Sequence, residues 1–103
     1  MSRVVAYVPD LMDRSRVSAV GDVTFVADPS RLAERAAEEG AEVVVVDLTR
    51  PGALEAVAGV EARVVGFANH TERELMDAAR AAGCDTVLAR SAFFARLGEL
   101  LGG

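Results

Sequence analysis

Charged side chains that could act together lie directly after runs of apolar residues. Asp47 follows Val43–Val46, and its segment reads Asp-Leu-Thr-Arg-Pro-Gly, which places Pro51 four residues after the carboxylate. Asp10 follows the apolar run Val4–Val8 and Pro9, and Arg90 follows the shorter run Val87–Ala89. A carboxylate at such a position can be a nucleophile or a metal ligand, or it can form the turn that leaves a strand. Both interpretations of Asp47 stay open on the sequence alone.

The other residues with reactive side chains offer less. His70 is the sole histidine and has no second histidine or cysteine beside it, so we expect a solvated loop residue. Cys84 is the sole cysteine, which excludes an internal disulfide and a cysteine-built zinc site. We expect Cys84 to be buried as a small apolar residue. Asp28 precedes Pro29 and is expected to cap a helix.

Strands and helices that would position these residues alternate along the chain. Runs rich in β-branched residues predict strands at Arg3–Val8, Asp22–Ala27, Glu42–Asp47, Ala62–Ala68 and Thr86–Ala89. Helical signals lie between the strands. The first three predicted helices cover 11–20, Asp28-Pro29 to Gly40, and Pro51 to near Gly59. A fourth helix runs from a capping box at Thr71–Glu74 to Gly83, and a fifth follows Ser91 as its cap. Continuous valines at 43–46 are typical of a central strand that is covered on both faces.

This alternation predicts an α/β fold, a doubly wound five-stranded parallel sheet of flavodoxin-like type with strand order 2-1-3-4-5. The length of 103 residues indicates a single domain over 1–103. Sites in such sheets form at the carboxyl ends of the strands. Those ends carry Pro9-Asp10, Asp28, Asp47, Ala68-Asn69-His70 and Ala89-Arg90-Ser91.

Taken together, the segment 47–52 and the order of elements resemble a CheY-like response-regulator receiver domain. The spacing Asp-x-x-x-Pro-Gly is common in that family, and Asp47 matches its phosphorylated aspartate. Ala-Ala-Gly-Cys-Asp at 81–85 matches the family's Ala-Gly-Ala before the last strand. The resemblance spans nearly the whole chain. It implies a phosphoacceptor at Asp47, a positively charged residue that contacts the phosphoryl group at Arg90, and a bound Mg²⁺.

Several positions depart from the receiver pattern. The acidic pair after the first strand becomes Pro9-Asp10, which leaves Asp10 as a weak candidate for a metal ligand or, alternatively, as a helix cap. The hydroxyl position is Ala68, the aromatic position is Val87, and the lysine position is Arg90. A missing hydroxyl removes a charge-assisted hydrogen bond worth about 1.5–3 kcal/mol. We therefore expect slow phosphorylation at best and weak coupling to the surface.

These departures favour a degenerate receiver, or pseudo-receiver, that is not an enzyme and works as a signalling or adaptor module. We expect it to bind a protein or a second copy through the helix that ends at Gly83, the strand Thr86–Ala89 and the last helix, with Val87, Phe93 and Phe94 as contacts. Adjacent helical positions diverge by about 100°, so one phenylalanine ring can face the core and the other the surface.

Two other functions remain open. One is a functional single-domain response regulator, phosphorylated at Asp47 by a histidine kinase with Mg²⁺. The other is a small-ligand-binding flavodoxin-like domain, for which the sequence offers no glycine-rich phosphate loop.

Composition narrows the partners further. The net charge of −5 argues against nucleic acid, because such affinity rests on basic residues that neutralise phosphates. All eleven basic residues are arginine, a bias typical of GC-rich bacterial genomes. The apolar runs are too short for a membrane span or a signal peptide, so we expect a cytoplasmic protein that does not bind membranes.

Overall fold

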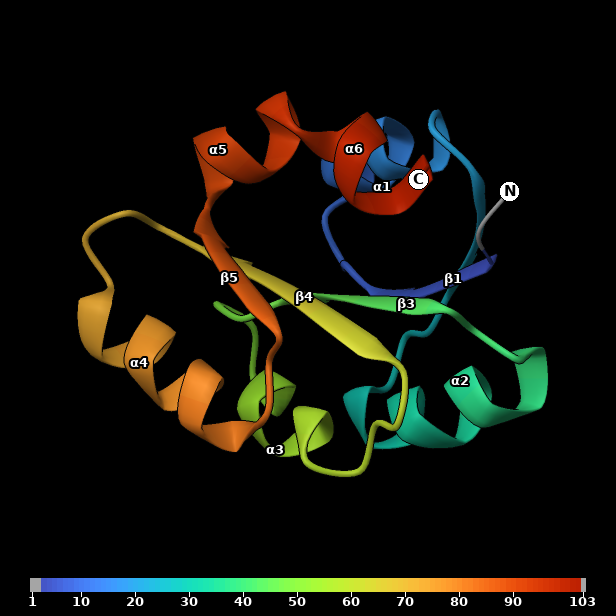
Figure 1. The fold of residues 1–103 in the computed structure, drawn as a ribbon, viewed down its shortest axis with the longest axis horizontal. Coiled ribbons are helices and arrows are strands. Elements are labelled where there is room, and N and C mark those ends of the chain that lie inside the picture. Colours follow the sequence, from blue (N-terminus) through green and yellow to red (C-terminus); the bar gives the residue numbers. More distant parts are fainter. Residues whose placement is uncertain (1–2, 103) are drawn as a thin grey trace.

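A parallel sheet forms the middle layer of the molecule (Figure 1). The structure, a computed structural model, describes residues 3–102. Its strands are β1 (Arg3–Tyr7), β2 (Asp22–Phe25), β3 (Val43–Asp47), β4 (Arg63–Ala68) and β5 (Thr86–Ala89). They pair in the order β2-β1-β3-β4-β5, and every pair is parallel. The predicted doubly wound sheet and its strand order are confirmed.

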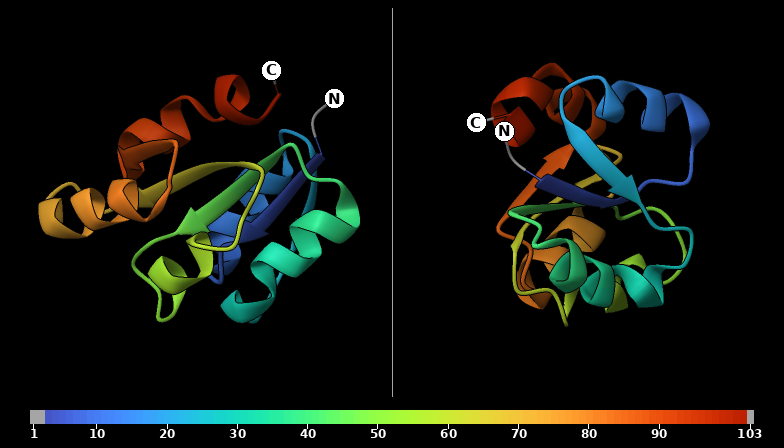
Figure 2. Two further views of the ribbon diagram at one scale, coloured as in Figure 1. Left: turned by 60° about the horizontal axis from the view of Figure 1, so that its bottom comes forward. Right: turned by 90° about the vertical axis from the view of Figure 1, so that its right-hand side faces the viewer.

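Short helices cover both faces of this sheet (Figures 1 and 2). One layer contains α1 (Leu11–Ser18), α5 (Arg90–Ala95) and α6 (Leu97–Gly102). The opposite layer contains the 3₁₀ turn η1 (Pro29–Arg31), α2 (Leu32–Glu39), α3 (Ala53–Val57) and α4 (Arg73–Ala82). Within residues 3–102, none of the helices combines the length and the apolar character that crossing a bilayer requires.

The central strand β3 is buried on both faces, as its run of valines predicts. Alternate side chains of a strand point to opposite faces. Val44 and Val46 accordingly join the core cluster under α2, α3 and α4, whereas Val43 and Val45 join the cluster under α1, α5 and α6. Because β3 is covered in this way, the residue at its carboxyl end is held by a rigid element.

The cap of η1 is confirmed, and the start of α3 differs from its prediction. The Asp28 carboxylate accepts hydrogen bonds from the backbone N–H and the hydroxyl of Ser30, at 3.0 and 2.8 Å. Pro51 does not open α3, because Gly52 precedes the helix in the left-handed region at φ +79°. A Cβ on Gly52 would lie 2.9 Å from Cγ of Pro29, so the close approach of the two loops also requires glycine.

The capping box predicted at Thr71–Glu74 is wrong. Helix α4 begins at Arg73, and the residue before it, Glu72, makes no side-chain cap. The Glu72 carboxylate instead accepts the backbone N–H of Asn69 at 3.2 Å, which closes the loop that leads into the helix. The side chain that could cap the helix therefore stabilises the preceding turn.

The cap predicted at Ser91 is also wrong. Helix α5 begins at Arg90, directly after β5, with Ala89 at the capping position and no side-chain cap. Ser91 lies in the first turn and is exposed. This immediate transition from strand to helix places Arg90 at the edge of the sheet, where it can reach the neighbouring helix α1.

Candidate functional site

The carboxyl ends of β1, β3 and β5 bring Asp10, Asp47 and Arg90 to one edge of the sheet. Parallel strands end at the same edge, so residues far apart in sequence meet there. The pKa of Arg90 is raised, first by a side-chain hydrogen bond to Asp13 and further by the negative charges of Asp47 and Asp10. These side chains thus share one electrostatic environment.

Asp13 and Arg90 form a two-pronged ion pair at this edge. Nη1 and Nη2 of Arg90 donate to Oδ2 and Oδ1 of Asp13, at 2.9 and 2.8 Å. The Asp13 side chain is 6% exposed and that of Arg90 38%. Paired parallel hydrogen bonds of this kind are among the stronger polar contacts in proteins. The pair joins α1 to the start of α5.

Sequence reasoning missed the role of Asp13. The two partners are 77 residues apart, so no local spacing indicates their contact. The available signal was an acidic residue on the face of α1 that also carries Val17, one turn further on, because both residues are buried. A buried carboxylate needs a charged or hydrogen-bonding partner.

Asp10 serves as the N-cap of α1. Its Oδ1 accepts the backbone N–H of Asp13 at 3.0 Å. This hydrogen bond is the main cause that lowers the pKa of Asp10, and the positive charges of Arg50 and Arg90 lower it further. The carboxylate is therefore oriented toward its own helix. Asp10 thus acts as the helix cap that was the alternative to a metal ligand in the sequence analysis.

Asp47 is buried at the end of β3 and bonded to the loop that follows it. Its Oδ1 accepts the backbone N–H and the hydroxyl of Thr49, at 3.0 and 2.6 Å. Its Oδ2 lies 3.5 Å from Nε of Arg50, an ion pair with weak hydrogen-bond geometry. The loop is fixed further by the Tyr7 hydroxyl, which donates to the carbonyl of Pro51 at 3.1 Å. These contacts are those of a turn-forming aspartate.

Aromatic rings pack behind the Asp13–Arg90 pair. Phe67 stacks on Phe93 with ring centroids 4.6 Å apart, and Phe94 meets both rings edge-on. The guanidinium carbon of Arg90 lies 5.5 Å from the Phe67 centroid and 5.3 Å from that of Phe94. Arg90 is therefore held by a carboxylate and by two aromatic rings.

Ala68 and Val87, for which the receiver resemblance implies a hydroxyl and an aromatic ring, are core residues. Ala68 is fully buried and its side chain is a methyl group. Val87 is 7% exposed and packs in the cluster under α2, α3 and α4. Phe93 is fully buried, whereas Phe94 is half-buried. Because Val87 and Phe93 are buried, they cannot line a contact surface, and that prediction is wrong for both. Of the three predicted contact residues, Phe94 is the one that is partly exposed.

Each carboxylate at this edge is already engaged by a group of the same chain. Mg²⁺ takes octahedral geometry and is usually held by one or two carboxylates together with waters. Over residues 3–102, no group of three acidic, histidine or cysteine side chains is arranged to hold a metal ion. Asp10 caps a helix, Asp13 is paired with Arg90, and Asp47 is bonded to its loop. Arginine side chains provide the positive charge that balances the two buried carboxylates.

The remaining predicted residues lie outside this site. His70 is exposed in the turn before α4, as expected. Cys84 is buried, also as expected, and desolvation raises the pKa of its thiol to about 11. Neither side chain is among the contacts of Asp13, Asp47 or Arg90.

Comparison with known proteins identifies the fold. No protein-family model matches the chain, and no curated protein matches it. Among solved structures, a response regulator from Hahella chejuensis is similar with a TM-score of 0.80 and 16% identity, over 94% of this chain and 89% of that one. Chemotaxis protein CheY4 from Vibrio cholerae is similar with a TM-score of 0.78 and 20% identity, over 98% and 99%.

A third similar structure is a co-crystal of the Saccharomyces cerevisiae histidine phosphotransfer protein Ypd1 with the receiver domain of Ssk1. Its TM-score is 0.78 at 12% identity, over 98% of this chain and 89% of that one. At these identities the likeness establishes architecture. The chain has the fold of a CheY-like receiver domain.

Proposed function

We propose that this chain is a non-enzymatic, receiver-like signalling or adaptor module, which binds another protein without the full phosphorylation switch. The receiver fold supports the signalling role, since the similar structures are response regulators and their domains. The observation that carries the absence of a full switch is the pairing of both buried carboxylates, Asp13 with Arg90 and Asp47 with Thr49 and Arg50.

A switch would require a phosphoryl group on Asp47 to favour a second conformation by several kcal/mol. Ala68 has no hydroxyl to bind that group, a loss worth about 1.5–3 kcal/mol. Arg90 already directs two of its five N–H donors at Asp13. A movement of Arg90 toward a phosphoryl group would therefore have to disturb an existing ion pair or use its remaining donors.

One observation favours a second candidate function. Asp47 lies at the sheet edge within the electrostatic reach of Arg90, as it would in a single-domain response regulator that accepts a phosphoryl group from a histidine kinase. The carboxylate would attack the phosphorus while the phosphohistidine nitrogen leaves. The third expectation, a small-ligand-binding domain, stays a prediction that none of the contacts described above supports.

A titration with Mg²⁺ and beryllofluoride, a phosphoryl analogue, distinguishes the first two functions. Backbone amide chemical shifts of the whole chain report the response, and Asp47→Asn is the matched control. We expect wild type and Asp47→Asn to respond alike, without saturable changes in amide chemical shift that are specific to wild type. Saturable shifts that spread from Asp47 to α4 and β5 in wild type alone would establish the second candidate and exclude the proposed one.

A further inference from the structure

Helix α3 is too short to cover its neighbour α2. It ends at Val57 after five residues, whereas α2 runs over eight residues from Leu32 to Glu39. The two helical segments meet where Gly59 follows α3, since a Cβ on Gly59 would lie 3.3 Å from Cβ of Ala33. A cavity opens on each side of this contact, and the two cavities form a groove between α2 and α3.

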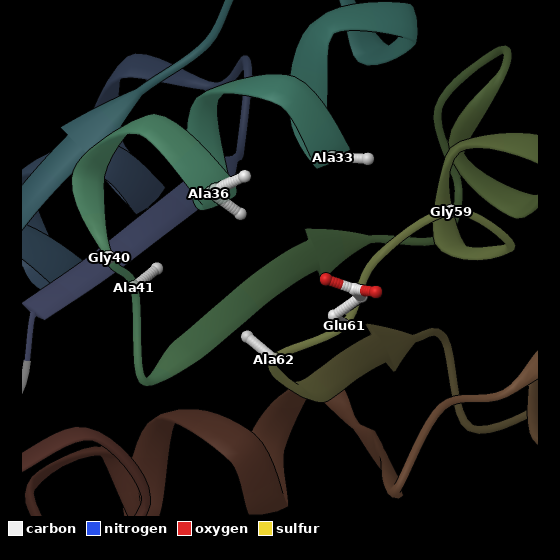
Figure 3. A pocket seen from close by; sticks show the side chains of 8 residues that line it. Ala33, Ala36, Gly40, Ala41, Gly59, Glu61 and Ala62 are labelled. Carbon is white, nitrogen blue, oxygen red and sulfur yellow. The ribbon is translucent and has the colours of Figure 1, made fainter.

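Ala33 and Gly59 line both cavities of the groove. The first cavity, of about 270 Å³, extends toward the end of α2 and the loop that leads into β4 (Figure 3). The second, of about 390 Å³, extends toward η1 and the start of α3. A cavity of about 150 Å³ is enough to hold benzene, so each of these has room for an aliphatic side chain. We define the α2–α3 groove by the residues Ala33, Ala37, Glu55, Ala56, Gly59 and Glu61.

The walls of this groove are mostly alanine and glycine, and its floor is the protein core. Ala36 and Ala62 point into the first cavity from opposite sides (Figure 3). Ala36 is 5% exposed and belongs to the core cluster under α2, α3 and α4, against which Ala62 packs. Alanine and glycine have no rotamer freedom to lose. A ligand that fills the groove therefore orders few groups of this chain.

The negative charge of the protein is concentrated in the segment that forms the groove. Residues 28–62 contain eight carboxylates and three arginines, a net charge of −5 that equals the net charge of the whole chain. Each of the three arginines is already paired with a carboxylate of the same segment: Arg31 with Glu34, Arg35 with Glu38 and Glu39, and Arg50 with Asp47. The excess charge of the segment is therefore available to a cationic partner.

Two of these carboxylates lie at the groove itself. Glu61 lines the first cavity and Glu55 lines the second. Both are exposed, and neither takes part in the ion pairs found within residues 3–102. Arg3 and Arg63, which begin β1 and β4, donate to backbone carbonyls instead. Each apolar cavity thus has a carboxylate at its rim that is not neutralised by an arginine.

We infer that the α2–α3 groove binds a basic segment of a partner protein, in which Lys or Arg flanks an aliphatic side chain on both sides. The aliphatic side chain packs between α2 and α3, and the basic side chains donate to the carboxylates of Glu55 and Glu61. The inference rests on the proposed function and names the chemistry of its partner. It places the contact on α2 and α3, and not on the face of α4, β5 and α5 that the sequence suggested.

A second copy of the chain does not suit this groove. A two-fold dimer through the groove would bring the acidic segments of both copies together, which opposes association. The groove also offers no bulky apolar side chain that could fill the groove of the other copy, because its apolar residues are alanine and glycine.

The test is a selection of random peptides displayed on phage against the intact chain, followed by titration of the selected peptides in solution. We expect the enriched peptides to carry Lys or Arg on both sides of Val, Leu, Ile or Met. Ala37→Leu fills the groove from an exposed position of α2, and leucine is nearly as good a helix former as alanine. Kd should rise about tenfold in Ala37→Leu, equivalent to about 1.4 kcal/mol, and about fivefold in Glu61→Lys, equivalent to about 1 kcal/mol. Urea midpoints near that of wild type will show that both variants fold.

Ala81→Leu and Glu74→Lys are the matched controls, because they make the same changes at exposed positions of α4. We expect peptide binding by both controls to stay within about twofold of wild type, a difference well below 1 kcal/mol. If Glu74→Lys weakened binding as much as Glu61→Lys, the peptides would be responding to the overall charge of the protein, and the inference would be overturned.

Other outcomes would also overturn it. These are a selection that enriches no basic peptides, basic peptides that bind Ala37→Leu as tightly as wild type, binding of spermine as tight as that of the peptides, and dimerisation in ultracentrifugation that Ala37→Leu abolishes. The beryllofluoride titration separates the two proposals. If that analogue moves amides over α4 and β5 in wild type alone while the selected peptides still require Ala37 and Glu61, the phosphorylation-independent function fails and the α2–α3 groove stands.

Discussion

At the scale of single residues, the central feature is an arginine that is fixed before any ligand arrives. Arg90 donates two hydrogen bonds to Asp13 and lies over the rings of Phe67 and Phe94. An arginine with a rigid donor fork and a bound carboxylate differs from a lysine that can follow a modified aspartate. The neighbouring carboxylate of Asp47 is likewise engaged, by Thr49.

Arg90→Met tests the importance of this pair for stability. The substitution leaves the Asp13 carboxylate buried without its charged partner. A hydrogen bond to a charged group contributes about 1.5–3 kcal/mol to the free energy of unfolding. We expect the free energy of unfolding to fall by about 2 kcal/mol, measured by urea denaturation. Arg31→Met removes an exposed partner of Glu34 and should cost at most about 1 kcal/mol. Equal losses in the two variants would contradict the structural role of Arg90.

Asp10→Asn separates the charge of the cap from its hydrogen bond. The fold lowers the pKa of Asp10 below its ordinary 3.8, mainly through the Asp13 backbone N–H. The ionised carboxylate therefore stabilises the fold above its unfolded pKa, and this stabilisation is lost as pH falls through the lower folded pKa. Asparagine still caps a helix. Urea midpoints should show wild type more stable than Asp10→Asn near neutral pH, with the difference vanishing in acid. A difference that is constant with pH would contradict this assignment.

At the scale of elements, α1 and α5 act as one unit on their side of the sheet. The Asp13–Arg90 pair joins their N-terminal ends, and the contact of Arg16 with Phe94 joins them one turn further along α1. On the opposite side, β4 passes so close to the end of β3 that a side chain at Gly66 would meet Leu48. Rigid packing on both sides of β3 and β4 limits movement of the edge.

Two glycine substitutions test this packing. A Cβ on Gly66 would lie 2.8 Å from Cδ1 and 3.0 Å from Cγ of the buried Leu48, so Gly66→Ala should lower the free energy of unfolding by about 1–3 kcal/mol. A Cβ on Gly98, within α6, would have no atom within 4 Å. Gly98→Ala should therefore stabilise by about 0.5–1 kcal/mol through helix propensity. Chemical denaturation of both variants checks the signs, and a stabilised Gly66→Ala would show that the edge can relax.

At the scale of the whole molecule, a receiver fold is combined with ion pairs that neutralise the buried carboxylates at its edge. Two acidic side chains at the sheet edge are balanced by arginines of the same chain.

The sequence predicted most of this architecture because strand and helix signals are local. Valines at 43–46 marked the central strand, and Thr86–Ala89 matched β5 in both limits. Some caps failed because a strand can pass straight into a helix, as at Arg90, or because a nearby backbone N–H can attract the capping side chain, as at Glu72.

The site was predictable only in part. Asp47, Asp10 and Arg90 follow from the rule that parallel strands end at one edge. The role of Asp13 does not follow from this rule, because its partner Arg90 is distant in sequence and their contact depends on how α1 packs on the sheet. Exposure of Leu11 and Met12 could not be predicted either, because a short helix with two adjacent apolar residues does not reveal which of its faces is buried.

Thermal unfolding of the intact wild-type chain with and without Mg²⁺ tests the central claim most directly, namely that arginines take the place of a metal at the carboxyl edge. A cation present at ten times its Kd would stabilise the fold by about 1.4 kcal/mol, which raises the Tm of a domain of this size by several degrees. We predict the same Tm in Mg²⁺ as in an equal ionic strength of sodium chloride. A Tm that keeps rising with the logarithm of the Mg²⁺ concentration above the sodium chloride control, and that no longer does so in Asp47→Asn, would contradict the account.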